Sequence, residues 1–193
     1  MLTSITPLGE RGRGNRFWLT RTWLLIGHVV GGLALGLVMS AGRAVVAWVG
    51  RPSDGTALVI IAVAAAVAVS GDVIGLTVPG RRQVDERWLT AYRGWVYGLG
   101  FGVQLGFGLV TVVNTLLLGV VLVAGVLLGP VQAIGLGVVY GTTRGIGATV
   151  NGGVRSVEDL RRLHRGLDQR ERAVRLTVLA SVVLVTLGAV ATS

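Results

Sequence analysis

Four polar or ionisable side chains interrupt otherwise apolar stretches of the sequence: His28, Asp72, Gln104 and Arg144. His28 lies six positions after Thr22 and Asp72 six positions before Val78, where two apolar segments begin and end. At 1.5 Å per residue, each is expected about 9 Å inside the same membrane face. Charged groups at such depth usually face a bundle interior or water and mark pathways. These four residues are therefore our candidates for a polar layer or transport path.

Two kinds of chemistry are open to this layer. A His28–Asp72 pair would pass protons, because imidazole titrates near neutral pH, or Asp72 would instead pair with Arg144. The alternative is structural: Asp72 is hydrated at the interface, Arg144 flanks a helix, and His28 is a hydrogen-bonded packing residue. For Gln104, as for Thr111, Asn114 and Thr115 further along, interhelical hydrogen bonding is the alternative to a path.

Missing residue types exclude several chemistries. All 18 basic residues are arginines, and the sequence has no lysine and no cysteine. Without cysteine there is no thiolate nucleophile and no cysteine metal site. Without lysine there is no Schiff base and no lysine-containing phosphate loop. Since no catalytic triad, metal cluster or paired carboxylates are visible either, we expect no enzyme, no cofactor and no metal.

The composition predicts an all-α polytopic integral membrane helix bundle. Of the residues, 52% are hydrophobic and 14% charged, against about 25% charged in soluble domains. Because a transmembrane helix needs about 20 apolar residues, we expect spans over 22–42 and 56–78, two spans within 95–141, and a fifth from 176. The break inside 95–141 falls at 114–119 or at Gly129-Pro130. The predicted regions are an Arg-rich tail (1–21), a four-helix transmembrane region (22–150), an amphipathic helix (151–175) and a C-terminal transmembrane helix (176–193).

The arginines predict the orientation of these spans. Sixteen of the 18 fall on one side, and only Arg43 and Arg51 fall on the other. Positive charge stays cytoplasmic, so we expect a cell-membrane protein with a cytoplasmic N-terminus and an extracytoplasmic C-terminus. The net charge of +9 lies beside apolar segments, which indicates anionic lipid headgroups as partners and argues against nucleic acid.

Glycines repeat every four positions along the third predicted span, at Gly94, Gly98, Gly102 and Gly106. Small residues at this spacing form a ridge that lets helix backbones approach closely in lipid. The same spacing recurs in three other segments, as in Gly27–Gly31 and Gly137–Gly141. A tightly packed bundle is predicted, as a homo-oligomer or with a membrane partner protein.

Two extramembrane segments have local signals. Ser156 and Asp159 form a capping-box-like helix start, followed by an apolar stripe and many arginines, as in a helix lying on a membrane surface; partner docking is the alternative. The first 16 residues contain Gly9, Gly12 and Gly14 and are expected to be a flexible tail.

The Gly- and Val-rich stretch from about 57 to 150, with its polar third helix, resembles DsbD/CcdA-like and LysE-like membrane proteins. This resemblance implies a small polytopic bundle that acts as a redox conduit or an exporter. The redox members use membrane cysteines, which this chain lacks, so electron transport is not expected. The six-helix, two-repeat plan is also one span short.

Two function classes follow from the sequence. The first is a small multi-pass transporter or export permease, proton-coupled through the polar layer, with an unidentified substrate. The alternative is a non-transporting membrane subunit or scaffold that docks a partner through its glycine ridges and its cytoplasmic helix.

Overall fold

The regular elements of the chain are helices throughout the part that the structure describes. This computed structural model describes residues 5–76, 87–109, 116–159, 161–163 and 165–166, and no strand occurs within them. The all-α prediction is confirmed. The helix expected over 176–193 lies outside the described residues, and so do Thr111, Asn114 and Thr115.

Among the described residues, two helices are long and apolar enough to cross a membrane. Helix α2 (Phe17–Val49) has 33 residues and helix α3 (Asp54–Val73) has 20. A four-residue turn joins them, and the Ser53 hydroxyl caps α3 by accepting a hydrogen bond from the N–H of Thr56 at 3.2 Å. At 1.5 Å per residue α2 is about 50 Å long, so in a bilayer with a core of about 30 Å it must tilt or protrude.

Two helices were expected in the stretch 95–141, and its described residues contain three. They are α5 (Gly94–Phe107), α6 (Leu117–Leu127) and α7 (Pro130–Ala148). Helix α5 ends where Gly108 takes a left-handed conformation (φ +73°), which glycine adopts without a steric penalty. Helix α7 begins at Pro130, whose missing N–H costs nothing in a first helical turn. The helical run is therefore broken twice rather than once.

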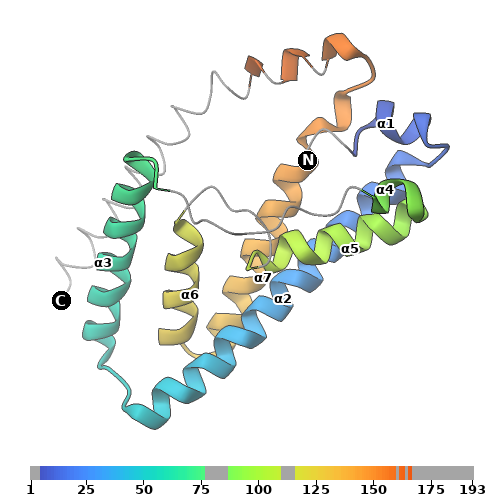
Figure 1. Ribbon diagram of the computed structural model, residues 1–193. Coiled ribbons are helices and arrows are strands. Elements are labelled where there is room, and N and C mark those ends of the chain that lie inside the picture. The colour runs from blue at the N-terminus through green and yellow to red at the C-terminus, as the bar shows by residue number, and fades with distance from the viewer. Residues whose placement is uncertain (1–4, 77–86, 110–115, 160, 164, 167–193) are drawn as a thin grey trace.

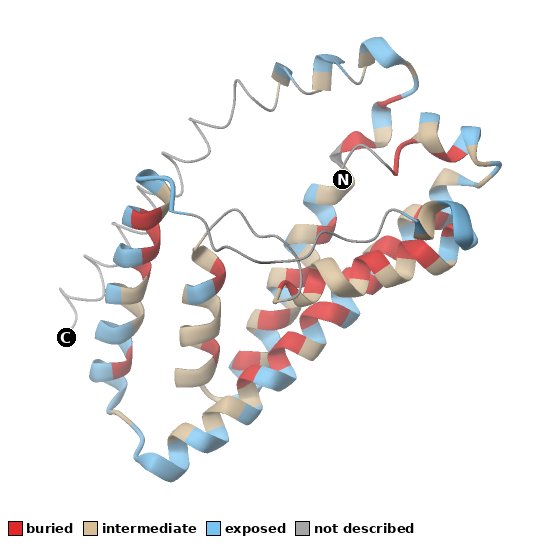
Figure 2. Ribbon diagram, viewed as in Figure 1, coloured by how far each residue is buried: buried red, intermediate tan, exposed pale blue. Residues whose placement is uncertain are grey.

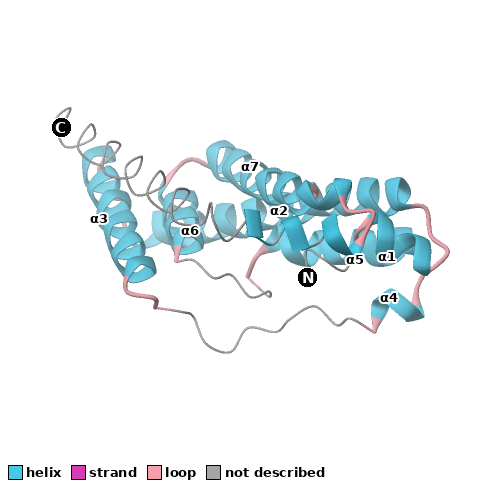
Figure 3. Cartoon of the chain, turned by 90° about the horizontal axis from the view of Figure 1, so that it is seen from above, coloured by secondary structure: helices cyan, strands magenta, loops and turns pink. Residues whose placement is uncertain are grey.

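Helix α2 is the central element of the bundle. Helices α5 and α7 pack along it, α5 parallel and α7 antiparallel. Helix α6 also packs against α2 and α7, and α3 packs against α6 (Figures 1 and 3). Buried positions concentrate on α2, α5 and α7, whereas α3 exposes much of its apolar surface (Figure 2). Two short helices, α1 (Pro7–Gly12) and α4 (Trp88–Ala91), and the 3₁₀ turn η1 (Val150–Gly153) complete the described elements.

In the part of the chain that the structure describes, two clusters of buried apolar side chains form the core. One contains Ile5, Leu24, Tyr97 and Phe101, near the beginnings of α2 and α5. The other contains Leu35, Met39, Leu118 and Ala133, and Phe107 and Leu109 pack against it. The first cluster includes a residue from the segment expected to be a flexible tail. That expectation differs from the structure, in which residues 5–15 dock on the bundle and include helix α1 (Figure 1).

Candidate functional site

The glycine ridge of α5 lies on the face that packs against α2. A Cβ added to Gly98 would lie 2.6 Å from the carbonyl oxygen of Thr20, and one added to Gly102 would lie 2.8 Å from the Cα of Gly27. A Cβ added to Gly106 would lie 2.7 Å from the Cα of His28, and one added to Gly94 would meet the side chains of Thr20 and Asn15. Backbone therefore touches backbone along this interface, and the ridge is used inside the chain.

A second glycine contact joins α2 to α7. Cβ atoms added to Gly137 and Gly141 would lie 2.8 Å from the Cα atoms of Gly36 and Gly32, respectively. The backbone of His28 lies between the two contacts, because its carbonyl oxygen is the closest neighbour of a Cβ at both Gly106 and Gly141. His28 is thus held where α2, α5 and α7 meet.

The His28 side chain is buried at this junction. It is 1% exposed, and its Nδ1 lies 2.8 Å from the carbonyl oxygen of Leu24 one turn earlier. A carbonyl only accepts hydrogen bonds, so Nδ1 carries the proton in this contact. The imidazole packs against Gly145 of α7, where an added Cβ would lie 3.1 Å from its Cγ. The next residue of α7 toward its N-terminus is Arg144.

Arg144 and Tyr140 connect α7 to the end of α5. Arg144 donates a hydrogen bond from a terminal guanidinium nitrogen to the Tyr140 hydroxyl at 2.7 Å, and its guanidinium carbon lies 5.6 Å from the centre of that ring. The Tyr140 hydroxyl lies 2.5 Å from the Cβ position of Gly108, directly after α5. Gln104 is half-buried in the last turn of α5, where its backbone carbonyl accepts a hydrogen bond from the N–H of Gly108 at 3.2 Å. Within the described ranges no carboxylate forms an ion pair with Arg144.

Asp72 lies elsewhere, at the contact between α3 and α6. It is in the last turn of α3, and its carboxylate accepts a hydrogen bond at 2.7 Å from the N–H of Leu116, directly before α6. At the other end of α6, the Arg43 guanidinium of α2 donates a hydrogen bond at 2.5 Å to the carbonyl of Leu127. An anion at the N-terminus and a cation at the C-terminus both match the helix dipole. The four candidates therefore divide into two groups. Three of them lie around the end of α5, namely His28, Gln104 and Arg144, whereas Asp72 caps the start of α6.

The charges at its two ends stabilise the short apolar helix α6. With 11 residues it is about 16 Å long, roughly half a bilayer core. Helix ends leave backbone N–H and C=O groups without partners, which is costly where no water reaches them. Phe107 and Leu109 at the end of α5 pack with Leu118 at the start of α6. Helices α5 and α6 thus follow one another as two short helices separated by a break, with helix ends inside the bundle.

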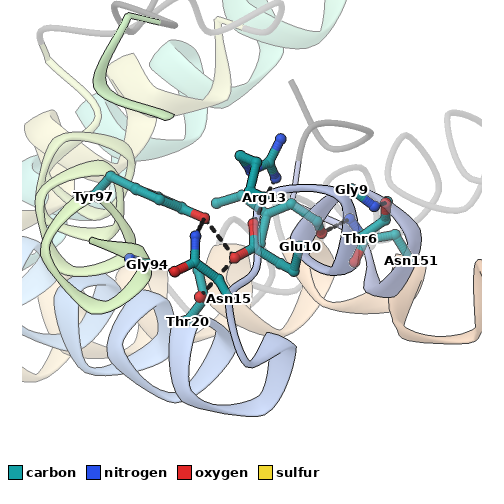
Figure 4. Close-up of polar contacts among 10 residues, drawn as sticks. Thr6, Gly9, Glu10, Arg13, Asn15, Thr20, Gly94, Tyr97 and Asn151 are labelled. Atoms are coloured by element: carbon teal, nitrogen blue, oxygen red, sulfur yellow. Dashed lines mark hydrogen bonds and ion pairs between the residues drawn. The ribbon is translucent and has the colours of Figure 1, made fainter. Parts of the chain in front are cut away.

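A further polar cluster was not predicted from the sequence. Glu10 of α1 has no exposed surface, and its Oε2 accepts hydrogen bonds from the hydroxyls of Tyr97 and Thr20, the latter at 2.9 Å (Figure 4). Its Oε1 accepts one from Arg13 at 2.5 Å. Asn15 extends the network by donating to the Tyr97 hydroxyl at 3.2 Å.

A local signal for this cluster exists in the sequence. Thr6 followed by Pro7 is a helix start, with a capping residue and then proline in the first turn, and Thr6 does accept a hydrogen bond from the N–H of Gly9 at 3.0 Å. An acidic residue on so short a helix needs a partner if it is buried. The partner Tyr97 is 87 positions away, and no local pattern identifies it.

The arrangement can therefore hold charge inside the bundle at three places: Glu10, the Asp72–α6–Arg43 unit, and Arg144 beside His28. Within the described part of the chain, no three His, Asp or Glu side chains are placed to bind a metal ion. Comparisons with protein-family models, curated proteins and solved structures gave no match to this chain.

Proposed function

We propose that the protein is a small multi-pass membrane transporter whose solute path runs beside the break between α5 and α6. The observation that carries this proposal is the break itself, with half-buried Gln104 and Arg144 and buried His28 near the end of α5. Transporters commonly build their sites from interrupted helices, because the helix ends offer dipoles and backbone polar groups at depth. A half-buried arginine without a carboxylate partner among the described residues would supply positive charge to that path.

The proposed membrane placement rests on the two ends of α2. Trp18 and Trp48 are 68% and 89% exposed and 30 positions apart, which is about 45 Å along a helix. A bilayer with its headgroups is about 40–45 Å thick, and tryptophans concentrate at both of its interfaces. Arg21, whose guanidinium lies 5.0 Å from the Trp18 ring centre, would meet anionic headgroups. This placement of α2 and the arginine distribution together support a cytoplasmic N-terminus, and the five spans expected from the sequence are part of the same proposal.

His28 is the group that we propose for proton coupling. It lies next to Arg144 across the α2–α7 contact, and imidazole is the side chain whose charge changes near neutral pH. Asp72 is not assigned this role, because its carboxylate holds the start of α6.

A membrane scaffold is the second candidate, and the apolar face of α3 favours it. Leu58, Val63 and Val67 are each about half exposed, and lipid or a partner helix would cover them. The glycine ridge of α5 gives this candidate no support, since α2 already occupies it.

The test is flux through purified protein in liposomes. An inward proton gradient is imposed and internal pH is followed with a trapped dye, alone and with each of a panel of amino acids, sugars and inorganic anions. We expect flux above that of empty liposomes with at least one solute, and about a tenfold loss in Arg144→Gln, as for loss of a hydrogen bond to a charged group. Arg51→Gln is the matched control, because Arg51 pairs with Asp54 at an exposed turn. Equal flux in Arg144→Gln and Arg51→Gln contradicts the proposed path, and a stoichiometric co-purified membrane partner with no flux favours the scaffold.

A further inference from the structure

The N-terminal segment of residues 5–15 ties three elements together at one end of the bundle. Glu10 accepts hydrogen bonds from Thr20 of α2 and Tyr97 of α5, and Asn151 of η1 donates to the carbonyl of Ile5 at 2.8 Å (Figure 4). We propose that this segment is a releasable latch, which closes the route from water to His28 and Arg144 at the end where α2 and α5 begin. That the route serves a solute rests on the proposed transport function; the latch itself does not.

The segment is built to come away as a unit. Its helix α1 has six residues, and helices shorter than about 12–15 residues are marginal in isolation, so its order depends on docking. Gly14, which joins it to α2, has a left-handed backbone (φ +71°) that glycine adopts freely. The outward-facing Leu8 and Arg11 are exposed. Docking relies on side-chain hydrogen bonds and Ile5, whereas α2, α5 and α7 pack backbone to backbone. The three helices can therefore stay packed when the segment leaves.

The latch covers a buried apolar cluster that lies between that end and His28. Ile5 packs in a cluster with Leu24, Tyr97 and Phe101, and the last two are 0% and 1% exposed. Leu24 is the residue whose carbonyl meets His28 Nδ1. Release of the segment would uncover this cluster and allow Glu10, Thr20 and Tyr97 to exchange their mutual hydrogen bonds for bonds to water. Local openings of this kind occur well below the free energy of global unfolding.

The absence of cysteine from the sequence makes a direct test possible. Leu24→Cys places a single thiol in the covered cluster, and Ala133→Cys places one in the second cluster, where Ala133 is 0% exposed. Labelling by a water-soluble maleimide is timed for each reporter in liposomes, with and without Tyr97→Phe. The latch predicts that Tyr97→Phe speeds labelling at position 24 about tenfold, as for loss of a hydrogen bond to a charged group, and leaves position 133 unchanged. Arg11→Gln, on the exposed side of α1, is the matched control and should change neither rate.

Two results would overturn the latch. Equal acceleration at both positions means that the segment unfolds only with the whole bundle, and no acceleration at either means that it does not release. Trypsin cleavage after Arg13 gives a second readout that needs no cysteine, and it should accelerate in Tyr97→Phe. Faster labelling at position 24 with no solute flux in any liposome assay would support the latch and count against the transport function.

Discussion

The close approach of α2 and α5 predicts that a single methyl group at the crossing point separates them. In Gly102→Ala the new Cβ would lie 2.8 Å from the Cα of Gly27, whereas carbon atoms pack at about 3.5 Å or more. Since the obstacle is backbone, and the carbonyl oxygen of Leu24 lies closer still, the helices must move apart by at least about 0.7 Å, which is the difference between those two carbon–carbon distances. Overpacking of this kind costs about 1–3 kcal/mol.

The matched control is Gly135→Ala on α7, where an added Cβ has no neighbour within 4 Å. Both variants gain the same helix propensity, about 0.5–1 kcal/mol, so this term cancels in the comparison. We therefore expect Gly102→Ala to be less stable than Gly135→Ala by about 1–3 kcal/mol. The assay is reversible unfolding in mixed micelles, followed by fluorescence of Trp23 and Trp95, whose rings lie 5.7 Å apart across the same interface. Equal stability of the two variants would refute the packing argument.

Three other predictions concern helix ends. Asp72→Ala should lower the free energy of unfolding by about 1–3 kcal/mol, because the N–H of Leu116 loses its charged acceptor. Asp72→Asn should lower the free energy of unfolding much less, because its amide oxygen can still accept that hydrogen bond. An equal loss in the two variants would contradict the capping role. Arg43→Gln should reduce amide protection at the end of α6 in hydrogen exchange, and unchanged protection would count against the contact with Leu127. Hydrogen bonds from the N–H groups of Arg155 and Ser156 lower the pKa of Asp159. The stabilisation of the helix start by Asp159 is therefore fully present above the unfolded-state pKa of about 3.9, and it is lost as the pH falls through the lower folded-state pKa. Asp159→Ala should remove this acid-dependent change in helicity, and persistence of the change would contradict the assignment.

Features that depend on local spacing could be predicted from the sequence. Glycines four positions apart share one face of a helix, and the structure places that face of α5 against α2. Ser156 and Asp159 form reciprocal hydrogen bonds, since each side chain accepts from the other residue's N–H at 3.1 Å. Apolar length was enough to identify α2 and α3, although α2 extends beyond the expected 22–42 at both ends.

Features that depend on which helices are neighbours could not be predicted. The depth argument placed Asp72 and His28 in one layer, but depth along separate helices says nothing about lateral position, and α3 packs mainly with α6. Whether Asp72 faces a path or caps a helix depends on where α6 begins. The sequence left that point open, because the break was expected either at 114–119 or at Gly129-Pro130. The docking of Glu10 required a partner on α5 that its own segment does not specify.

A hydrated path at the break between α5 and α6 is the central claim, and thiol accessibility tests it most directly. The measurement compares Gln104→Cys, at the end of α5, with Leu33→Cys, which is 41% exposed on the outer face of α2, each as the only cysteine of the chain in liposomes. Thiolates form in water and not in lipid, so a path predicts that a membrane-impermeant maleimide labels Gln104→Cys and leaves Leu33→Cys unlabelled. Labelling of neither thiol, with both proteins folded and also when Tyr97→Phe is added to release the latch, would contradict the path.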